Sequence, residues 1–147
     1  MDGDAARDDE GDAAPVTALL LAYYRALESG APLAPFYATD AAAGDLGPVV
    51  KFGSGKGEAF RGSAAVTAEV VRVGAALSAN RLESRALTAR RRGDVGWFSD
   101  LVWWSGADGA GGDRTAAPFA SLTRWSGVCL RLPEGWRLLQ MHVSEEV

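Results

Sequence analysis

The stretch DVGWFSDLVWW, residues 94–104, decides the fold class, because apolar and aromatic residues alternate along it with a period of two. Three other stretches share this pattern and are rich in β-branched and aromatic residues: 80–91, 118–131 and 136–146. The joints between them carry turn residues, namely RGD at 92–94, a glycine-rich segment at 106–115 and LPEG at 132–135. We therefore expect four long antiparallel strands from residue 80 onward.

Upstream of residue 80 the apolar spacing is helical. A first helix is expected from Pro15 to Gly30, with an apolar face made by Val16, Leu19, Leu20, Tyr23, Tyr24 and Leu27. Residues 32–41 contain two prolines and allow only a short helix, and residues 49–52 (VVKF) indicate a strand. Ser63 is expected to cap a third helix whose apolar face is Val66, Val70, Val73 and Leu77.

Helices followed by an antiparallel sheet predict an α+β fold. A strongly twisted sheet of this length must curl, so we expect a cone-shaped sheet with the helices packed on its concave face.

The glycine-rich stretch FGSGKGEAFRG, residues 52–62, tests the hypothesis of a phosphate site. A P-loop needs Ser or Thr after its Gly-Lys pair, but Gly57 follows Lys56 here. The dinucleotide pattern G-x-G-x-x-G fits no better, because Glu58 or Phe60 falls where its third glycine belongs. A strand-to-helix turn explains these glycines without a ligand, so no nucleotide cofactor is expected.

Charge and composition exclude several function classes. Residues 1–12 carry six acids and one arginine, a net charge of −5 in a chain whose total is −4. We expect residues 1–14 to form a disordered acidic tail and 15–147 to form one domain. The acidic start does not resemble a signal peptide and no apolar run is long enough to cross a membrane, which predicts a soluble cytoplasmic protein. The single cysteine, Cys129, excludes an internal disulfide and is expected to be a buried apolar residue.

Two further classes of partner are not expected. Arg90, Arg91 and Arg92 form the only basic cluster, and three arginines at a strand end are more typical of a solvated turn than of a nucleic-acid site. His142 is the only histidine, and no His, Asp or Glu spacing supplies the three or four converging ligands that a metal requires.

Three pieces of sequence carry a family resemblance: Gly57-Glu58-x-Phe60-Arg61-Gly62 before the third helix, GDVGWFSD at 93–100, and Trp136 six residues before His142. With the order of elements, they make residues 15–146 similar to the SnoaL-like branch of the nuclear transport factor two-like superfamily. The resemblance implies that Glu58 and Arg61 pair with each other or contact backbone in the glycine loop, while Phe60 closes the cone.

Members of this superfamily typically bind small molecules inside the cone and form homodimers through the outer sheet face. The resemblance implies both for this chain, and a face of apolar side chains on 94–104 and 136–146 also indicates that a second copy covers it. Some relatives, including the association domain of a calmodulin-dependent kinase, line the cone with arginines. Val102, Gly127 and Val143 stand at those positions here, so an anion-binding pocket is not expected.

Strand alternation predicts which residues face the cone. On the last strand Leu139, Met141 and Val143 are expected inside, with Trp136, Leu138, Gln140 and His142 outside. On 94–104 the inside set is Phe98, Asp100, Val102 and Trp104, and the outside set includes Trp97 and Trp103. The candidate ligand-binding residues are Tyr24, Phe36, Tyr37, Phe98, Trp104, Trp125 and Met141, which suit an apolar or ring-shaped ligand or simply fill the core.

The candidate catalytic residues are Asp100 and His142. A carboxyl group inside an apolar cone favours its neutral form and can transfer a proton, unless Asp100 pairs with an arginine such as Arg124. His142 is a candidate acid–base group as the sole histidine, or a hydrogen-bonded structural residue.

Two functions therefore remain open. One is a small-molecule-binding protein, either a binder or a cofactor-independent isomerase, cyclase or hydratase. The other is a non-catalytic homodimeric interaction module with a vestigial cavity. A cavity of several hundred cubic ångströms beside a buried Asp100 would favour the first.

Overall fold

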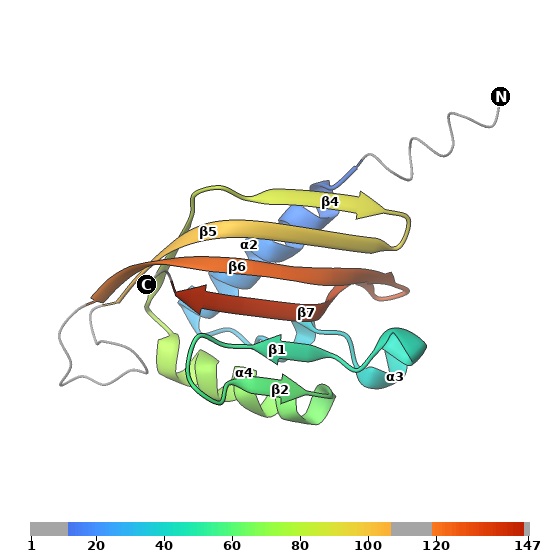
Figure 1. Ribbon diagram of the computed structural model, residues 1–147, viewed down its shortest axis with the longest axis horizontal. Helices are drawn as coiled ribbons and strands as arrows, with labels where there is room; N and C mark the ends of the chain where they lie inside the picture. The colour runs from blue at the N-terminus through green and yellow to red at the C-terminus, as the bar shows by residue number, and fades with distance from the viewer. Residues whose placement is uncertain (1–11, 107–118, 146–147) are drawn as a thin grey trace.

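The computed structural model describes residues 12–106 and 119–145 (Figure 1). The helices are α2 (Ala14–Ser29), α3 (Asp40–Ala43) and α4 (Ser63–Leu77), with 3-10 turns η1 (Ala34–Phe36) and η2 (Gly44–Leu46). The strands are β1 (Val50–Phe52), β2 (Ala59–Arg61), β3 (Arg81–Ser84), β4 (Thr88–Arg92), β5 (Val95–Gly106), β6 (Phe119–Leu132) and β7 (Gly135–Glu145). The predicted tail over residues 1–11 and most of the predicted glycine-rich hairpin lie outside the described residues.

One sheet contains the strands in the order β2-β1-β7-β6-β5, with β3 and β4 both paired to β5 at the far edge. Neighbouring strands are antiparallel except for β1 and β7, which run parallel. Figure 1 shows α2 and α4 on one side of this sheet, which curls without closing. The predicted α+β fold with helices on the concave face is confirmed.

Helix α2 follows its sequence signals closely. It begins at Ala14, where Asp12 Oδ1 accepts a hydrogen bond from the Ala14 amide at 3.0 Å, and Pro15 lies in its first turn. It ends at Ser29, and the capping residue Gly30 has a φ of +74°, the left-handed conformation that glycine favours.

The predicted single strand over 80–91 is wrong, because it divides into β3 and β4. Residues 85–87 leave the sheet, and the Ala86 amide donates a hydrogen bond to Asp100 Oδ1 at 3.1 Å. A side chain on β5 thus satisfies a backbone donor that has no partner in the ladder. The division lets one curled strand, β5, pair with both segments along the same edge.

The capping of α4 also differs from the prediction. Gly62, not Ser63, precedes the helix, and the Ser63 side chain makes no cap bond to it. Instead, Asp40 Oδ2 accepts a hydrogen bond from the Ser63 amide at 2.8 Å, and Oδ1 accepts one from Val49 at 3.0 Å. The hydrogen bonds from these backbone amides lower the pKa of Asp40. Asp40, which lies more than twenty positions upstream, therefore caps α4.

The sheet faces agree with strand alternation on β5 and differ from it on β7. Phe98, Asp100 and Val102 are buried, whereas Trp97 and Trp103 are exposed on the outer face. On β7 the pairing with β6 shifts between Val128 and Cys129, so Leu138 is fully buried although alternation placed it outside. A β-bulge adds one residue to one strand, which inverts the side-chain pattern beyond it. Met141 and Val143 are buried as predicted.

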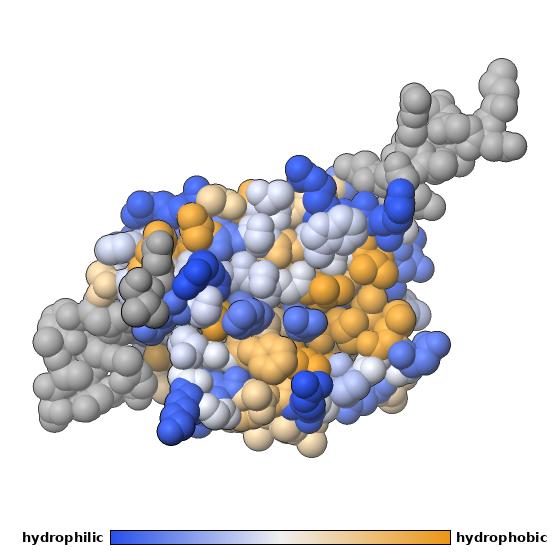
Figure 2. Space-filling model, viewed as in Figure 1, coloured by the Kyte–Doolittle hydropathy of each residue, from blue (hydrophilic) through white to orange (hydrophobic). Residues whose placement is uncertain are grey.

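The outer sheet face combines apolar and polar side chains (Figure 2). Among the side chains that the structure describes, the exposed large apolar residues of this face are on β5: Val95, Trp97, Leu101 and Trp103. In the part of the chain that the structure describes, no helix is both long and apolar enough to cross a membrane.

Candidate functional site

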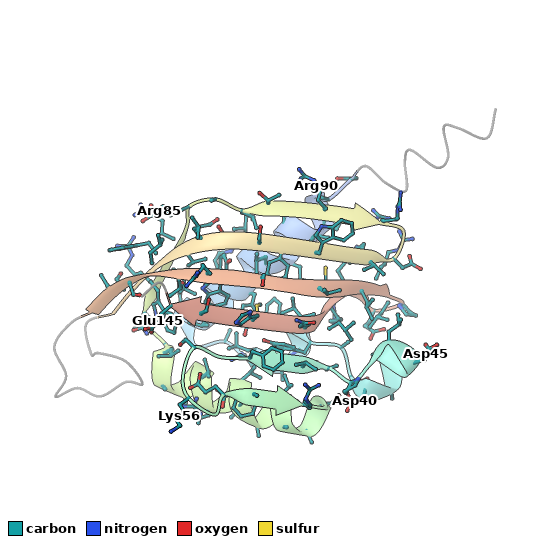
Figure 3. The ribbon with its side chains drawn as sticks, in the orientation of Figure 1. Asp40, Asp45, Lys56, Arg85, Arg90 and Glu145 are labelled. Atoms are coloured by element: carbon teal, nitrogen blue, oxygen red, sulfur yellow. The ribbon has the colours of Figure 1, made fainter. Side chains whose placement is uncertain are left out.

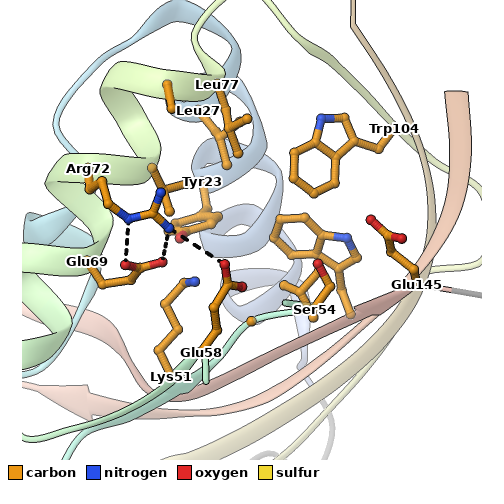
Figure 4. Close-up of a pocket in the computed structure, with 15 residues that line it drawn as sticks. Tyr23, Leu27, Lys51, Ser54, Glu58, Glu69, Arg72, Leu77, Trp104 and Glu145 are labelled. Carbon is orange, nitrogen blue, oxygen red and sulfur yellow. Dashed lines mark hydrogen bonds and ion pairs between the residues drawn. The ribbon is translucent and has the colours of Figure 1, made fainter. Parts of the chain in front are cut away.

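A cavity of about 150 Å³ opens between the two long helices and the concave face of the sheet (Figure 4). Its apolar wall consists chiefly of Tyr23, Leu27, Leu77, Trp104, Trp125 and Val143. Its polar wall consists of Lys51, Ser54, Glu58, Glu69, Arg72 and Glu145. The cavity is smaller than the several hundred cubic ångströms expected from the sequence, and it is much more charged than the predicted apolar cone.

Trp125 is fixed at the centre of the apolar wall. Its indole Nε1 donates a hydrogen bond to Thr123 Oγ1 at 2.8 Å, and the Thr123 hydroxyl donates to the Val102 carbonyl at 2.8 Å. The ring packs edge to face against Tyr24 at 5.2 Å and Trp104 at 6.4 Å between centroids. Because the hydrogen bonds set the ring orientation, the aromatic wall is formed before any ligand arrives.

Glu69 and Arg72 form the core of the polar wall. The Glu69 side chain is only 3% exposed, and it accepts hydrogen bonds from Arg72 Nε at 3.0 Å and Nη2 at 2.8 Å. In this bidentate interaction the planar guanidinium group donates one hydrogen bond to each carboxylate oxygen, which raises the pKa of Arg72. The residues lie three apart on α4, so the helix itself holds the pair in register.

Glu58 faces the same group from the glycine loop between β1 and β2. Its Oε2 accepts a hydrogen bond from the Gly55 amide at 3.0 Å, and its Oε1 lies 3.7 Å from Arg72 Nη2. A Cβ at Gly53 would overlap this carboxylate, and one at Gly55 would lie 2.8 Å from Oε1. The loop therefore does hold an anion, but the anion is the side chain of Glu58. Of the two expected arrangements, Glu58 adopts the contact with loop backbone, and its ion pair is with Arg72 and not with Arg61.

Lys51 on β1 points into the polar wall between these two carboxylates (Figure 4). The residue is only 6% exposed, and burial lowers the pKa of its ammonium group. The charges of Glu69 and Glu58 act in the opposite direction but do not cancel this effect. No described residue places an acceptor within hydrogen-bonding or ion-pair distance of Nζ. A buried lysine without such a partner is rare in proteins.

Two buried tyrosines extend the wall behind the cavity. The hydroxyl groups of Tyr23 and Tyr37 are hydrogen-bonded to each other at 2.9 Å. Burial raises the pKa of Tyr23 to about 12, and it also raises the pKa of Tyr37. Both groups stay neutral at physiological pH, so Tyr23 offers the cavity a neutral phenol.

Asp100, the predicted catalytic acid, is buried but does not line this cavity. Its Oδ2 accepts a hydrogen bond from the Tyr24 hydroxyl at 2.9 Å, while Oδ1 binds the Ala86 amide. The predicted alternative partner, Arg124, instead donates to the Glu145 carbonyl. Both carboxylate oxygens thus have partners that brace α2 and the break in the edge strand.

His142, the second catalytic candidate, lies exposed on the outer sheet face. Its ring packs edge to face against Phe52 at 6.0 Å between centroids. Asp100 is buried and His142 is exposed, yet both residues border a second, more open pocket on the sheet, together with Arg124 and Ser126. Within the described residues, no three His, Cys, Asp or Glu side chains are grouped so as to hold a metal ion.

The predicted ligand-binding residues divide into two groups. Trp104 and Trp125 line the cavity. The others pack in the core or against it: Tyr24, Phe36, Tyr37, Phe98 and Met141.

A family model describing a SnoaL-like domain matches residues 16–147. The chain belongs to the SnoaL-like domain family. Solved structures of similar fold include a candidate dehydratase of the NTF2-like family from Streptomyces avermitilis, at 20% identity, with a TM-score of 0.78, 91% of this chain covered and 95% of that one. No curated protein sequence matches the chain.

Two further structures illustrate the range of this fold. A candidate calcium/calmodulin-dependent protein kinase II association domain from Xanthomonas campestris is 18% identical, with a TM-score of 0.71 and coverage of 92% of this chain and 89% of that one. An NTF2-like protein of unknown function from Pseudomonas putida is 20% identical, with a TM-score of 0.67 and coverage of 90% and 84%. At these identities the likeness concerns the fold.

Sequence reasoning missed most of the polar wall of this SnoaL-like domain, although signals were present. Glu69 lies three residues after Val66 on the apolar face of its helix, a position where a charged residue is unusual. Lys51 stands between Val50 and Phe52 and is one of only two lysines, beside thirteen arginines. Both signals indicate buried charges, which must meet a partner in the fold.

Proposed function

We propose that this SnoaL-like domain binds a small ring-containing molecule in the cavity between α2, α4 and the sheet. The observation that carries the proposal is a preformed wall of Trp104, Trp125 and Tyr23 facing a group of charges in which Lys51 and Glu69 are buried. The cavity volume of about 150 Å³ is that of an engineered protein cavity known to accept benzene. The expected ligand is therefore about one ring in size, with a polar substituent directed toward the charges.

The same arrangement supports an enzymatic form of this function, a cofactor-independent isomerase, cyclase or hydratase. Such reactions move a proton to or from a bound substrate. Glu58 is the better proton acceptor, because Arg72 occupies both oxygens of Glu69 whereas Glu58 Oε1 has only a 3.7 Å ion pair. The likeness to a candidate dehydratase agrees with this form.

Blocking the cavity is expected to abolish binding. Ala76 lines the cavity, and a phenyl group there would occupy the volume of a one-ring ligand. Ala76→Phe should weaken binding of ethylbenzene and acetophenone by at least tenfold, as measured by calorimetry. At one hundred times Kd, either compound should stabilise the wild-type protein by roughly 2.7 kcal/mol.

Ala75→Phe provides the matched control, because Ala75 is the exposed neighbour on the same helix and is absent from the cavity wall. It should bind both compounds like the wild-type protein. Equal binding by the two variants, or no binding of any one-ring compound to the wild-type protein, would contradict the proposal.

We also propose that a second copy of the chain covers the outer face of β5. Trp97 is 45% exposed and Trp103 is 36% exposed there, and two aromatic side chains on one face are unusual for a surface in water. Analytical ultracentrifugation of the wild-type protein is expected to show a dimer. Trp97→Glu should shift the monomer–dimer equilibrium toward the monomer. A monomer at all concentrations would contradict this proposal.

A further inference from the structure

Lys51 is the feature of the cavity that the proposed function alone does not explain. A buried ammonium group loses its hydration and is retained in proteins when it is paired or when it serves a ligand. Among the described residues, Nζ has neither a hydrogen bond nor an ion pair, and the charges of Glu69, Glu58 and Arg72 act on it from a greater distance. The group is therefore available to donate a hydrogen bond into the cavity.

The choice of lysine at this place is informative. Thirteen of the fifteen basic residues are arginines, and the other lysine, Lys56, is exposed in the glycine loop. Figure 3 shows Lys56 pointing away from the sheet at the outer end of that loop. An arginine would present a planar fork suited to a carboxylate or phosphate, whereas an ammonium group acts as a compact donor toward a single oxygen.

The charges around Lys51 decide between ligand classes. Arg72 and Glu69 neutralise each other through two hydrogen bonds. Lys51 then faces Glu58 inside the cavity, with Glu145 exposed at its margin. A carboxylate ligand would add a negative charge beside these carboxylates, and an ammonium ligand would compete with Lys51 for them. A neutral oxygen acceptor meets the ammonium group without either penalty.

We propose that the cavity selects a neutral one-ring carbonyl compound and that Lys51 Nζ donates a hydrogen bond to its carbonyl oxygen. This inference rests on the proposed function, since it names the ligand class of the same cavity. The ring lies against Trp104 and Trp125, and the carbonyl group points toward Lys51. Lys51 is thus the residue that determines specificity for the carbonyl group.

The test compares acetophenone with ethylbenzene, which differ in the carbonyl oxygen, and adds benzoate and benzylamine as charged probes. A hydrogen bond from a charged donor is expected to make acetophenone bind the wild-type protein at least tenfold more tightly than ethylbenzene. In Lys51→Met this preference should fall below threefold, while ethylbenzene still binds. Lys56→Met is the matched control and should keep the full preference.

The outcomes separate this inference from the proposed function. If ethylbenzene binds and acetophenone binds no more tightly, or if Lys51→Met keeps the preference, the inference is overturned and the proposed function stands. Tightest binding of benzoate or benzylamine would overturn the neutral class in the same way. If no one-ring compound binds the wild-type protein, both proposals fail together. Binding of ethylbenzene to Lys51→Met also shows that this variant has kept its fold.

Discussion

Titration of the folded protein to pH 10 is expected to produce almost no tyrosinate absorbance, although half of the tyrosines of an unfolded chain would ionise there. The chain has three tyrosines, Tyr23, Tyr24 and Tyr37, and all three are buried. Burial is the largest cause that raises the pKa of each, to about 12 for Tyr23. Further alkali should then ionise them together, in one step that coincides with unfolding.

The direction of this coupling follows from the protons that each state holds. Below pH 10 the tyrosines are protonated in both the folded and the unfolded state. Their ionisation therefore does not reduce the free energy of unfolding in this range. Between pH 10 and about 12 the unfolded chain releases protons that the folded protein retains, so the free energy of unfolding falls as pH rises. Tyr23 alone should account for a loss of roughly 2–3 kcal/mol by pH 12.

Tyrosinate absorbance and far-ultraviolet circular dichroism, recorded on the same samples, measure this expectation. The two signals should change over the same pH interval. A gradual rise of tyrosinate absorbance centred near pH 10, with circular dichroism unchanged, would show that the tyrosines are accessible and would contradict the packing of α2 against the sheet. Denaturant-unfolded protein is the control and should titrate near pH 10.

The parts of the fold that sequence predicted well are those with a strong local pattern. Helix α2 has an unbroken apolar face and a proline and a glycine at its ends, and its observed bounds differ from the prediction by one residue. Alternation along β5 correctly placed Phe98 inside and Trp97 outside, because the whole strand pairs with β6 without a bulge.

The errors occur where residues distant in sequence determine the local structure. The bulge lies in β7 at Leu139 and depends on how β7 pairs with β6, so strict alternation within β7 could not reveal that Leu138 is buried. The α4 cap comes from Asp40, and the break in the edge strand is satisfied by Asp100. Each of these is a hydrogen bond across the fold that no local pattern encodes.

The candidate site shows the same limit. Trp104, which strand alternation placed inside, and Trp125, which was named for its aromatic character, both line the cavity. The polar wall instead joins β1, the glycine loop, α4 and the end of β7, and each of these four elements contributes one or two charged residues. Sequence reasoning considered only Arg61 and the backbone as partners of Glu58, whereas the folded chain also brings Arg72 to it from the helix.

Gly127→Ala is expected to reduce the free energy of unfolding by about 3 kcal/mol or more, which lowers the Tm by about 10 °C for a domain of this size. Gly127 pairs with Phe98 on β5 and with Met141 on β7 in the middle of the sheet. A Cβ there would overlap the Gln140 carbonyl oxygen and lie 2.7 Å from Cζ of the Phe98 ring. The backbone and a buried aromatic ring cannot move aside to make room for the Cβ, whereas a flexible surface side chain could.

Gly74→Ala is the matched control for this substitution. Gly74 lies inside α4, and a Cβ there would meet only Leu33 Cδ1, at an ordinary distance of 3.8 Å. Alanine should therefore stabilise the protein by about 0.5–1 kcal/mol, because it favours the helix more than glycine does. Opposite signs in urea unfolding of the two variants are the expected result. If Gly127→Ala left the free energy of unfolding unchanged, the Phe98 ring would not cover Gly127, and the cone would have room there for a larger side chain.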